Sequence, residues 1–354
     1  MARKIAARRG RGRRGTPAAR PWWASLSDDE LLDVRLCDLG VRLAGTPLER
    51  RLERLHGELE RRGLLLLPHA WLSTEWFSPA GVAGFAIPFY LAHPRLRRLE
   101  ERQMLDVEGG SEAACMQLMR HETGHVVDTV HRLHFKKRWR ETFGRFGERY
   151  APVYRPIPYS RRFVQHLEHW YAQSHPAEDF AETFAVWLRP RSGWRKRYRG
   201  WPALTKLEYV DELMRSLAGV RPPGLVRERT EEISSLRLTL REHYAAKRAR
   251  YTGRSPVFDR SLLALFAPAG LAEPRRSAAA WLRRHQPYIR AEIARRSGEY
   301  PYAADQVLRE MIGRCRRLGL VVDPDRPAAR LEQAVRTAMH ILAQLHAAEH
   351  SVRR

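Results

Sequence analysis

The spacing of hydrophobic residues predicts two paired helices near the start of the chain. Leucines there recur every three or four residues, which is the repeat of one face of an α-helix. Ser27 and Glu30 have the spacing of a capping box, so they predict the start of the first helix. Thr46 before Pro47 predicts the second start, and Gly63 ends the leucine stripe that follows. Because few residues separate the two helices, we expect them to pack against each other.

Residues 63–91 have a different pattern, in which proline and glycine interrupt short apolar and aromatic runs. This pattern is typical of strands and turns, and it predicts a small sheet. Pro88 lies inside the second run and has no N–H to donate, so we expect this strand at an edge of the sheet. An edge strand can bind an extended peptide through its free backbone groups.

The rest of the chain returns to helical spacing. Further helices are predicted over residues 111–133, from Pro176 onward, and over 204–217, 227–251, 281–294, 304–318 and 329–347. The proline-rich and glycine-rich stretch 267–274 comes before the last three of them and predicts a domain boundary. The pattern therefore predicts an α+β, mostly helical fold. We expect a tail over 1–21, a catalytic domain over 22–266 and a helical C-terminal module over 267–354.

Length and charge narrow the function only in part. A chain of 354 residues is longer than one hydrophobic core usually needs, which agrees with two folded parts. The net charge of +24 would attract phosphate groups, and the first twenty residues, which lack acidic side chains, predict a disordered basic tail. The other arginines are spread over helix faces in doublets such as Arg97 and Arg98, without a basic and aromatic platform. Nucleic-acid binding is therefore disfavoured as the main role.

Neither a membrane segment nor a disulfide framework is expected. No stretch approaches the ~20 uncharged apolar residues that would span a bilayer, and the tail lacks the apolar run of a secretory signal. Cys37, Cys115 and Cys315 are far apart and have no metal-ligand spacing. These features favour a cytoplasmic protein, and they leave its oligomeric state open.

One motif predicts specific chemistry. Residues 121–125 read His-Glu-Thr-Gly-His, an HExxH sequence within the helix predicted over 111–133. Histidines four residues apart lie one turn apart on the same face, so His121 and His125 can bind one metal ion. Zinc lowers the pKa of a bound water to about 7, and Glu122 can act as the general base toward that water. The motif predicts a zinc peptidase of the zincin type with one Zn2+ per chain.

A catalytic zinc ion needs a third protein ligand, usually a carboxylate. Asp128 follows His121 by seven residues, so its Cα lies ~10 Å further along the helix axis; we interpret it as a helix-surface residue or as support for a ligand. Glu178 and Glu182 are better candidates, since they lie one turn apart in the helix that begins near Pro176. They share their face with alanines, which would let the two helices approach closely. The nearby histidines have no spacing of a second metal site and are interpreted as packing or capping residues: His166, His169 and His175.

Two segments resemble a known family. Residues 171–185 read Tyr-Ala-Gln-Ser-His-Pro-Ala-Glu-Asp-Phe-Ala-Glu-Thr-Phe-Ala, and residues 87–91 read Ile-Pro-Phe-Tyr-Leu. Together with HExxH they are similar to the bacterial zinc-binding metallopeptidases, from about Trp22 through the C-terminal module, and the site resembles that of anthrax lethal factor. The resemblance implies a zincin-like core in which Glu178 is the third ligand and Glu182 orients His121. It also implies that Tyr171 polarises the scissile carbonyl.

The predicted function is hydrolysis of a peptide or amide bond by an activated water. Glu122 would be the general base, while the metal and Tyr171 would stabilise the oxyanion; the substrate would be a peptide or protein. One alternative is a non-catalytic protein with a structural zinc ion that binds RNA or an acidic partner through its basic surface, and such a site does not require Glu122. Another alternative is a zinc amidase that acts on a small molecule or a modified peptide.

Overall fold

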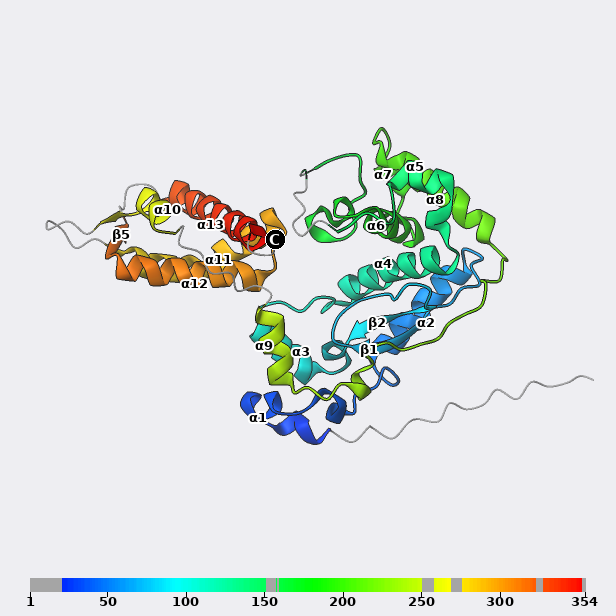
Figure 1. Ribbon diagram of the computed structural model, residues 1–354, viewed down its shortest axis with the longest axis horizontal. Helices are drawn as coiled ribbons and strands as arrows, with labels where there is room; N and C mark the ends of the chain where they lie inside the picture. Colours follow the sequence, from blue (N-terminus) through cyan, green and yellow to red (C-terminus); the bar gives the residue numbers. More distant parts are fainter. Residues whose placement is uncertain are drawn as a thin grey trace, which may run out of the picture.

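Among the residues that it describes, the computed structural model has two large hydrophobic cores and a small cluster of Trp71, Val82 and Ala86. Figure 1 shows the helices and strands that surround the two large cores. The structure describes residues 21–150, 157, 159–249, 258–268, 276–322 and 327–351, so the predicted basic tail lies outside the described residues except for Pro21. The chain around the first core comprises η1 (Trp22–Ser25), α1 (Asp28–Leu32), η2 (Leu36–Leu39), α2 (Pro47–Glu60), β1 (His69–Ser73), β2 (Gly84–Pro88), η3 (Phe89–Ala92), α3 (Pro94–Met104), α4 (Glu112–Val130), η4 (Leu133–Phe135), α5 (Lys137–Phe143), η5 (Glu168–Gln173), α6 (Pro176–Leu188), α7 (Trp194–Arg197), α8 (Ala203–Leu217), η6 (Ile233–Ser235) and α9 (Leu240–Ala249). The chain around the second core comprises α10 (Phe258–Leu265), β3 (Ala267–Pro268), β4 (Arg276–Ser277), α11 (Ala278–Ser297), α12 (Pro301–Arg317), β5 (Leu320–Val322) and α13 (Pro327–Ser351). The fold is thus α+β and mostly helical, as predicted.

The predicted helix starts are confirmed by their caps. The Ser27 hydroxyl accepts a hydrogen bond from Glu30 N, and the Glu30 carboxylate accepts one from Ser27 N, so the capping box forms. The Thr46 hydroxyl accepts from Leu48 N at 3.2 Å, with Pro47 in the first turn. These side chains satisfy N–H groups that the helix itself leaves without partners.

The sheet of the first core has two parallel strands. β1 pairs with β2 from His69 opposite Gly84 to Ser73 opposite Pro88. Every residue of β2 is buried, and Ala86 N donates a hydrogen bond of 2.8 Å to Phe77 O on the side of β2 away from β1. The predicted edge position of the Pro88 strand is confirmed, because within the described residues this sheet has only the strands β1 and β2. Its outer side is partly paired with Phe77, so it is not a fully open edge for a peptide. β2 also packs against α4, so the sheet supports the helix that carries the HExxH motif (Figure 1).

The two cores divide earlier than the boundary predicted at residues 266 and 267. Tyr244 belongs to the first core, whereas Leu262, Leu265 and Phe266 belong to the second. α10 therefore packs with the C-terminal helices α12 and α13. The reason is that an amphipathic helix joins the core that its apolar face can cover, and proline-rich sequence downstream of it does not decide which core that is.

The helix predicted over 227–251 is wrong in its first half. α9 begins only at Leu240, after Thr239 and Glu242 form a reciprocal cap in which Thr239 N donates to the Glu242 carboxylate at 2.7 Å. The Thr-x-x-Glu spacing was the sequence signal for this start. Within residues 227–239, only η6 is helical.

Within the described residues, none of the helices combines the length and the apolar character that crossing a lipid bilayer requires. All three cysteines are free thiols, and Cys115 and Cys315 are buried in the first and second cores respectively.

Candidate metal centre

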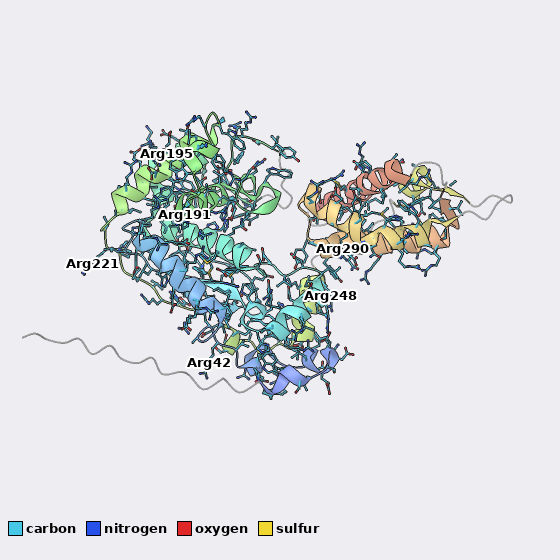
Figure 2. The ribbon with its side chains drawn as sticks, turned by 180° about the vertical axis from the view of Figure 1, so that it is seen from behind. Arg42, Arg191, Arg195, Arg221, Arg248 and Arg290 are labelled. Carbon is cyan, nitrogen blue, oxygen red and sulfur yellow. The ribbon has the colours of Figure 1, made fainter. Side chains whose placement is uncertain are left out.

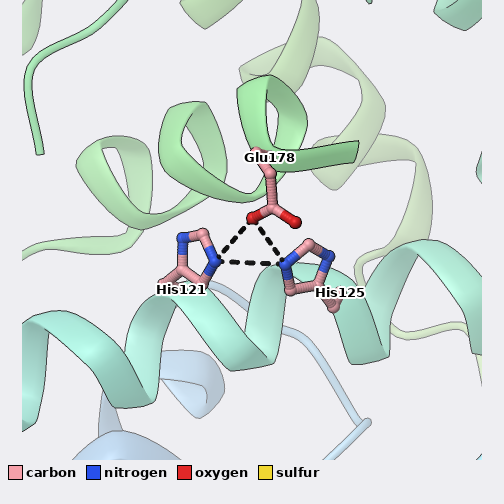
Figure 3. A group of neighbouring side chains, drawn as sticks. All are labelled: His121, His125 and Glu178. Atoms are coloured by element: carbon pink, nitrogen blue, oxygen red, sulfur yellow. Dashed lines mark hydrogen bonds and ion pairs between the residues drawn. The ribbon is translucent and has the colours of Figure 1, made fainter. Parts of the chain in front are cut away.

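The candidate centre lies where α4 packs against α6 (Figure 3). His121 and His125 lie one turn apart on α4, and Glu178 faces them from the first turn of α6. The helices approach closely at Gly124. A Cβ atom added there would lie only 2.8 Å from Ala181 Cα. The prediction that small residues bring these helices together is confirmed, and the glycine of the motif is needed for this approach.

Three ligand atoms converge at this contact. His121 Nε2 lies 3.1 Å from His125 Nε2 and 3.0 Å from Glu178 Oε2, and His125 Nε2 lies 3.1 Å from the same oxygen. Ligands ~2.0–2.1 Å from a tetrahedral zinc ion lie about 3.3–3.4 Å apart. The triangle therefore needs to open by only a few tenths of an ångström to become one face of a coordination tetrahedron. The three residues could hold a metal ion.

The chemistry of the donor set restricts which metal fits. Two imidazole nitrogens and one carboxylate oxygen suit Zn2+, and the same set also suits Fe2+. Mg2+ and Ca2+ prefer sites made entirely of oxygen ligands. The side chain of His125 is 18% exposed, so the group opens toward solvent on the side of this histidine.

Glu182 supports the first histidine. Its Oε1 accepts a hydrogen bond of 2.9 Å from His121 Nδ1, and its Oε2 accepts one of 2.8 Å from Leu167 N. The ring nitrogen is the donor in the bond to Glu182, so Nδ1 carries a proton and Nε2 is the nitrogen turned toward the ligand group. Glu182 therefore fixes the orientation of the His121 ring.

The cluster strongly perturbs the pKa values of its members. Burial acts to lower the pKa of His121, but Glu178 and Glu182 outweigh burial and raise that pKa well above its usual range. Burial also acts to raise the pKa of Glu178, whereas His125 and His121 hold it well below its usual range. Glu178 is thus ionised, and a metal ion must compete with a proton for His121.

Ser78 holds the predicted general base. Glu122 is buried on α4, and the Ser78 hydroxyl lies 2.8 Å from Glu122 Oε2 and 3.1 Å from Glu122 O. Ser78 comes from the connection between β1 and β2, 44 residues before Glu122. Sequence reasoning missed it, because no local repeat relates a loop serine to a helix so far along the chain.

Two tyrosines flank the ligand group. The ring of Tyr171, in η5, has its centroid 5.8 Å from that of His121, so the structure brings this predicted residue to the site. Tyr150 was not predicted, and its hydroxyl donates a hydrogen bond of 2.6 Å to Glu178 Oε1. Burial, followed by the negative charge of Glu178, raises the pKa of Tyr150 above its usual range. Tyr150 lies outside every predicted element, so no pattern in the sequence indicates its role.

The other polar residues near the motif have packing roles. Asp128 is buried and accepts a hydrogen bond of 3.0 Å from His134 Nδ1; it is not on the helix surface and is not part of the ligand group. His166 exchanges hydrogen bonds with Gln117, and His175 caps α6 by accepting from Ala177 N. The predicted packing and capping roles of these two histidines are confirmed.

Comparison of the chain with models of known protein families, with curated proteins and with solved structures found no match. The functional argument therefore depends on the geometry of the site and on the motifs of this chain.

Proposed function

We propose that this protein is a zinc-dependent hydrolase of peptide or amide bonds, built on a zincin-like core. The observation that carries the proposal is the convergence of His121 Nε2, His125 Nε2 and Glu178 Oε2 within 3.0–3.1 Å of one another. Zinc held there would supply a Lewis acid and lower the pKa of a water molecule to about 7.

The side chains around the ligand group would perform the proton transfers. Glu122 takes the proton of the attacking water and later passes it to the leaving amine, and the hydrogen bond from Ser78 holds this carboxylate in place. Tyr171 donates a hydrogen bond to the carbonyl oxygen as negative charge develops there. Glu182 keeps the His121 ring in the orientation that turns Nε2 toward the ligand group.

A structural zinc site is the first alternative, and the ligand count argues against it. Structural sites almost always have four protein ligands, whereas catalytic sites have three and keep one position for water or substrate. The described part of the chain offers a group of three, with His125 partly exposed. This count supports a catalytic centre.

The basic surface does not favour RNA binding as the main role. Arginines occur on both parts of the chain, from α7 of the first to α11 of the second (Figure 2). The labelled examples are Arg42, Arg191, Arg195, Arg221, Arg248 and Arg290. Such a distribution is typical of solvated helix faces.

The test combines metal analysis with a cleavage assay. Full-length protein, expressed with metal present, should hold about one zinc ion per chain by elemental analysis. It should also cleave members of a peptide library, detected by mass spectrometry. Glu122→Gln should keep the zinc and lose hydrolysis by ~10²–10⁴ in rate, because it removes only the base.

Glu112→Gln is the matched control, since Glu112 lies on the same helix, is exposed, and pairs with Arg54. It should cleave like the unchanged protein. A protein with full zinc content whose cleavage is unaffected by Glu122→Gln would contradict the proposed mechanism. Stoichiometric iron in place of zinc would contradict the metal assignment.

A further inference from the structure

Tyr150 contacts the oxygen of Glu178 that the histidines do not use. Its hydroxyl donates to Oε1 at 2.6 Å, whereas Oε2 lies 3.0 Å from His121 Nε2 and 3.1 Å from His125 Nε2. The two oxygens of one carboxylate therefore have separate partners. A phenol hydroxyl is neutral near pH 7, so it can donate to Oε1 without bringing a positive charge that would compete with a metal ion for Glu178.

The Tyr150 ring is also held by His175, the N-cap residue of the helix that carries Glu178. It stacks on His175 with a centroid distance of 4.0 Å and an interplanar angle of 12°. His175 is fixed at both nitrogens: Nδ1 accepts from Ala177 N at 3.1 Å, so Nε2 carries the proton that it donates to Glu148 O at 3.0 Å. The cap of α6 thus also sets the plane of the tyrosine.

Core packing does not account for this arrangement. Tyr150 is 54% exposed and belongs to neither of the two large hydrophobic cores. Ordering an exposed side chain costs conformational entropy, and the contacts that offset this cost are the ones with His175 and Glu178.

We infer that Tyr150 is a positioning residue for the third metal ligand. By holding Oε1, its hydroxyl would leave Glu178 to bind a metal ion through Oε2 alone and would keep the remaining coordination position for water and substrate. A carboxylate released from this bond is free to bind through both oxygens and to fill that position. Loss of a hydrogen bond to a carboxylate that binds a metal generally lowers the affinity for that metal. The inference depends on the proposed metal centre.

The test measures metal binding without any peptide. In Tyr150→Phe, which removes only the hydroxyl, Zn2+ affinity measured against a chromophoric chelator should fall by ~10–100-fold. Co2+ bound to this variant should have weaker visible absorption than in the unchanged protein, because a carboxylate bound through both oxygens raises the coordination number. After a chelator has removed the metal, Tyr150→Phe should have the same melting temperature as the unchanged protein.

Tyr159→Phe is the matched control, because Tyr159 is 74% exposed and contacts Trp170 rather than a ligand. It should leave the affinity and the Co2+ spectrum unchanged. Tyr150→Ala should lose as much affinity as Tyr150→Phe; if only the alanine variant loses affinity, the ring and not the hydroxyl matters, and the inference is wrong. An unchanged affinity and spectrum in Tyr150→Phe would overturn it as well.

The two proposals can fail separately. If Tyr150→Phe weakens metal binding as expected but the unchanged protein cleaves no peptide, the hydrolase proposal is rejected and the positioning role is kept. Cleavage that depends on Glu122, with metal binding insensitive to Tyr150→Phe, would reject the positioning role alone.

Discussion

The two hydrophobic cores differ in what they bury. Of the 19 buried polar or charged side chains among the described residues, 18 precede α10. The exception is Asp305 in the second core, which accepts hydrogen bonds from Gln286 at 2.8 Å and Arg309 at 2.6 Å. Burying polar groups costs stability unless they are hydrogen-bonded, so their concentration in one core indicates a role other than packing.

Several of these buried groups connect helices around the metal centre. Arg120, next to His121, binds Glu58 of α2 through two hydrogen bonds of 2.7 and 2.9 Å. Lys206 of α8 binds Asp179, next to Glu178, at 2.5 Å. Buried ion pairs add little net stability compared with apolar packing, but they fix the positions of the elements that they join. The first core therefore positions a site, whereas the second is stabilised mainly by apolar packing.

The largest expected effect is on catalysis and tests whether the chemistry belongs to the first core. Tyr171→Phe should lower kcat by ~10²–10³ and change KM little, because it removes a donor that acts mainly in the transition state. Zinc content and melting temperature should not change. Tyr288→Phe, at an exposed tyrosine of the second core, is the control and should have normal kinetics. Normal kcat with a lower melting temperature in Tyr171→Phe would make Tyr171 a packing residue.

The next largest effect is on Zn2+ affinity, and it distinguishes the third ligand, Glu178, from Glu182, which supports a ligand. Glu178→Ala should weaken Zn2+ binding by more than about 100-fold, and Glu182→Ala by ~10–100-fold, since Glu182 acts only through His121. Competition with a chelator of known affinity measures both. Glu332→Ala in the second core, which breaks surface ion pairs with Arg296 and Arg336, should leave affinity unchanged. The reverse order of the two first-core variants would assign the third ligand to Glu182.

Glycine-to-alanine changes in the two cores should have opposite signs. In Gly124→Ala the new Cβ would lie 2.8 Å from Ala181 Cα, so α4 and α6 must separate; we expect a loss of ~1–3 kcal/mol in free energy of unfolding and weaker metal binding. In Gly313→Ala the nearest atom is the mobile end of Arg317 at 3.6 Å, so helix propensity should add up to about 1 kcal/mol. Urea unfolding measures both. A stabilised Gly124→Ala protein would contradict the close packing at the metal centre.

The smallest effect is the pH dependence of stabilisation by the metal. The pKa of His121 is raised above its ordinary value of 6.5, so in the metal-free protein this group contributes stability that is fully present below pH 6.5 and is lost as pH rises through the folded-state pKa. Protons also compete less with the metal as pH rises. Chelation should therefore lower the melting temperature more near pH 8 than near pH 6. Hydrogen exchange should place the change in α4 and α6 and leave α11 and α12 unaffected; a larger effect at the lower pH would contradict this assignment.

Much of the metal centre could be predicted from the sequence because it depends on local geometry. Residues four apart on a helix share a face, so HExxH determines that His121 and His125 can bind one ion wherever α4 lies. The caps at Ser27 and Thr46 have similar local causes, since a helix start needs partners for its first N–H groups, and Pro176 at the start of α6 has no N–H that needs one. The class of fold follows from the same periodicities.

Only the tertiary structure decided which distant residues complete the site. Tyr150 precedes Glu178 by 28 residues and Ser78 precedes Glu122 by 44, and no helical or strand repeat extends over such separations. The burial of β2 and the assignment of α10 to the second core likewise depend on which apolar surfaces meet. The sequence thus determined which residues can act together within one helix. The packing of α4 against α6 through Gly124 and Ala181 decided that the ligands from both helices converge, because only close contact brings their atoms within coordination distance.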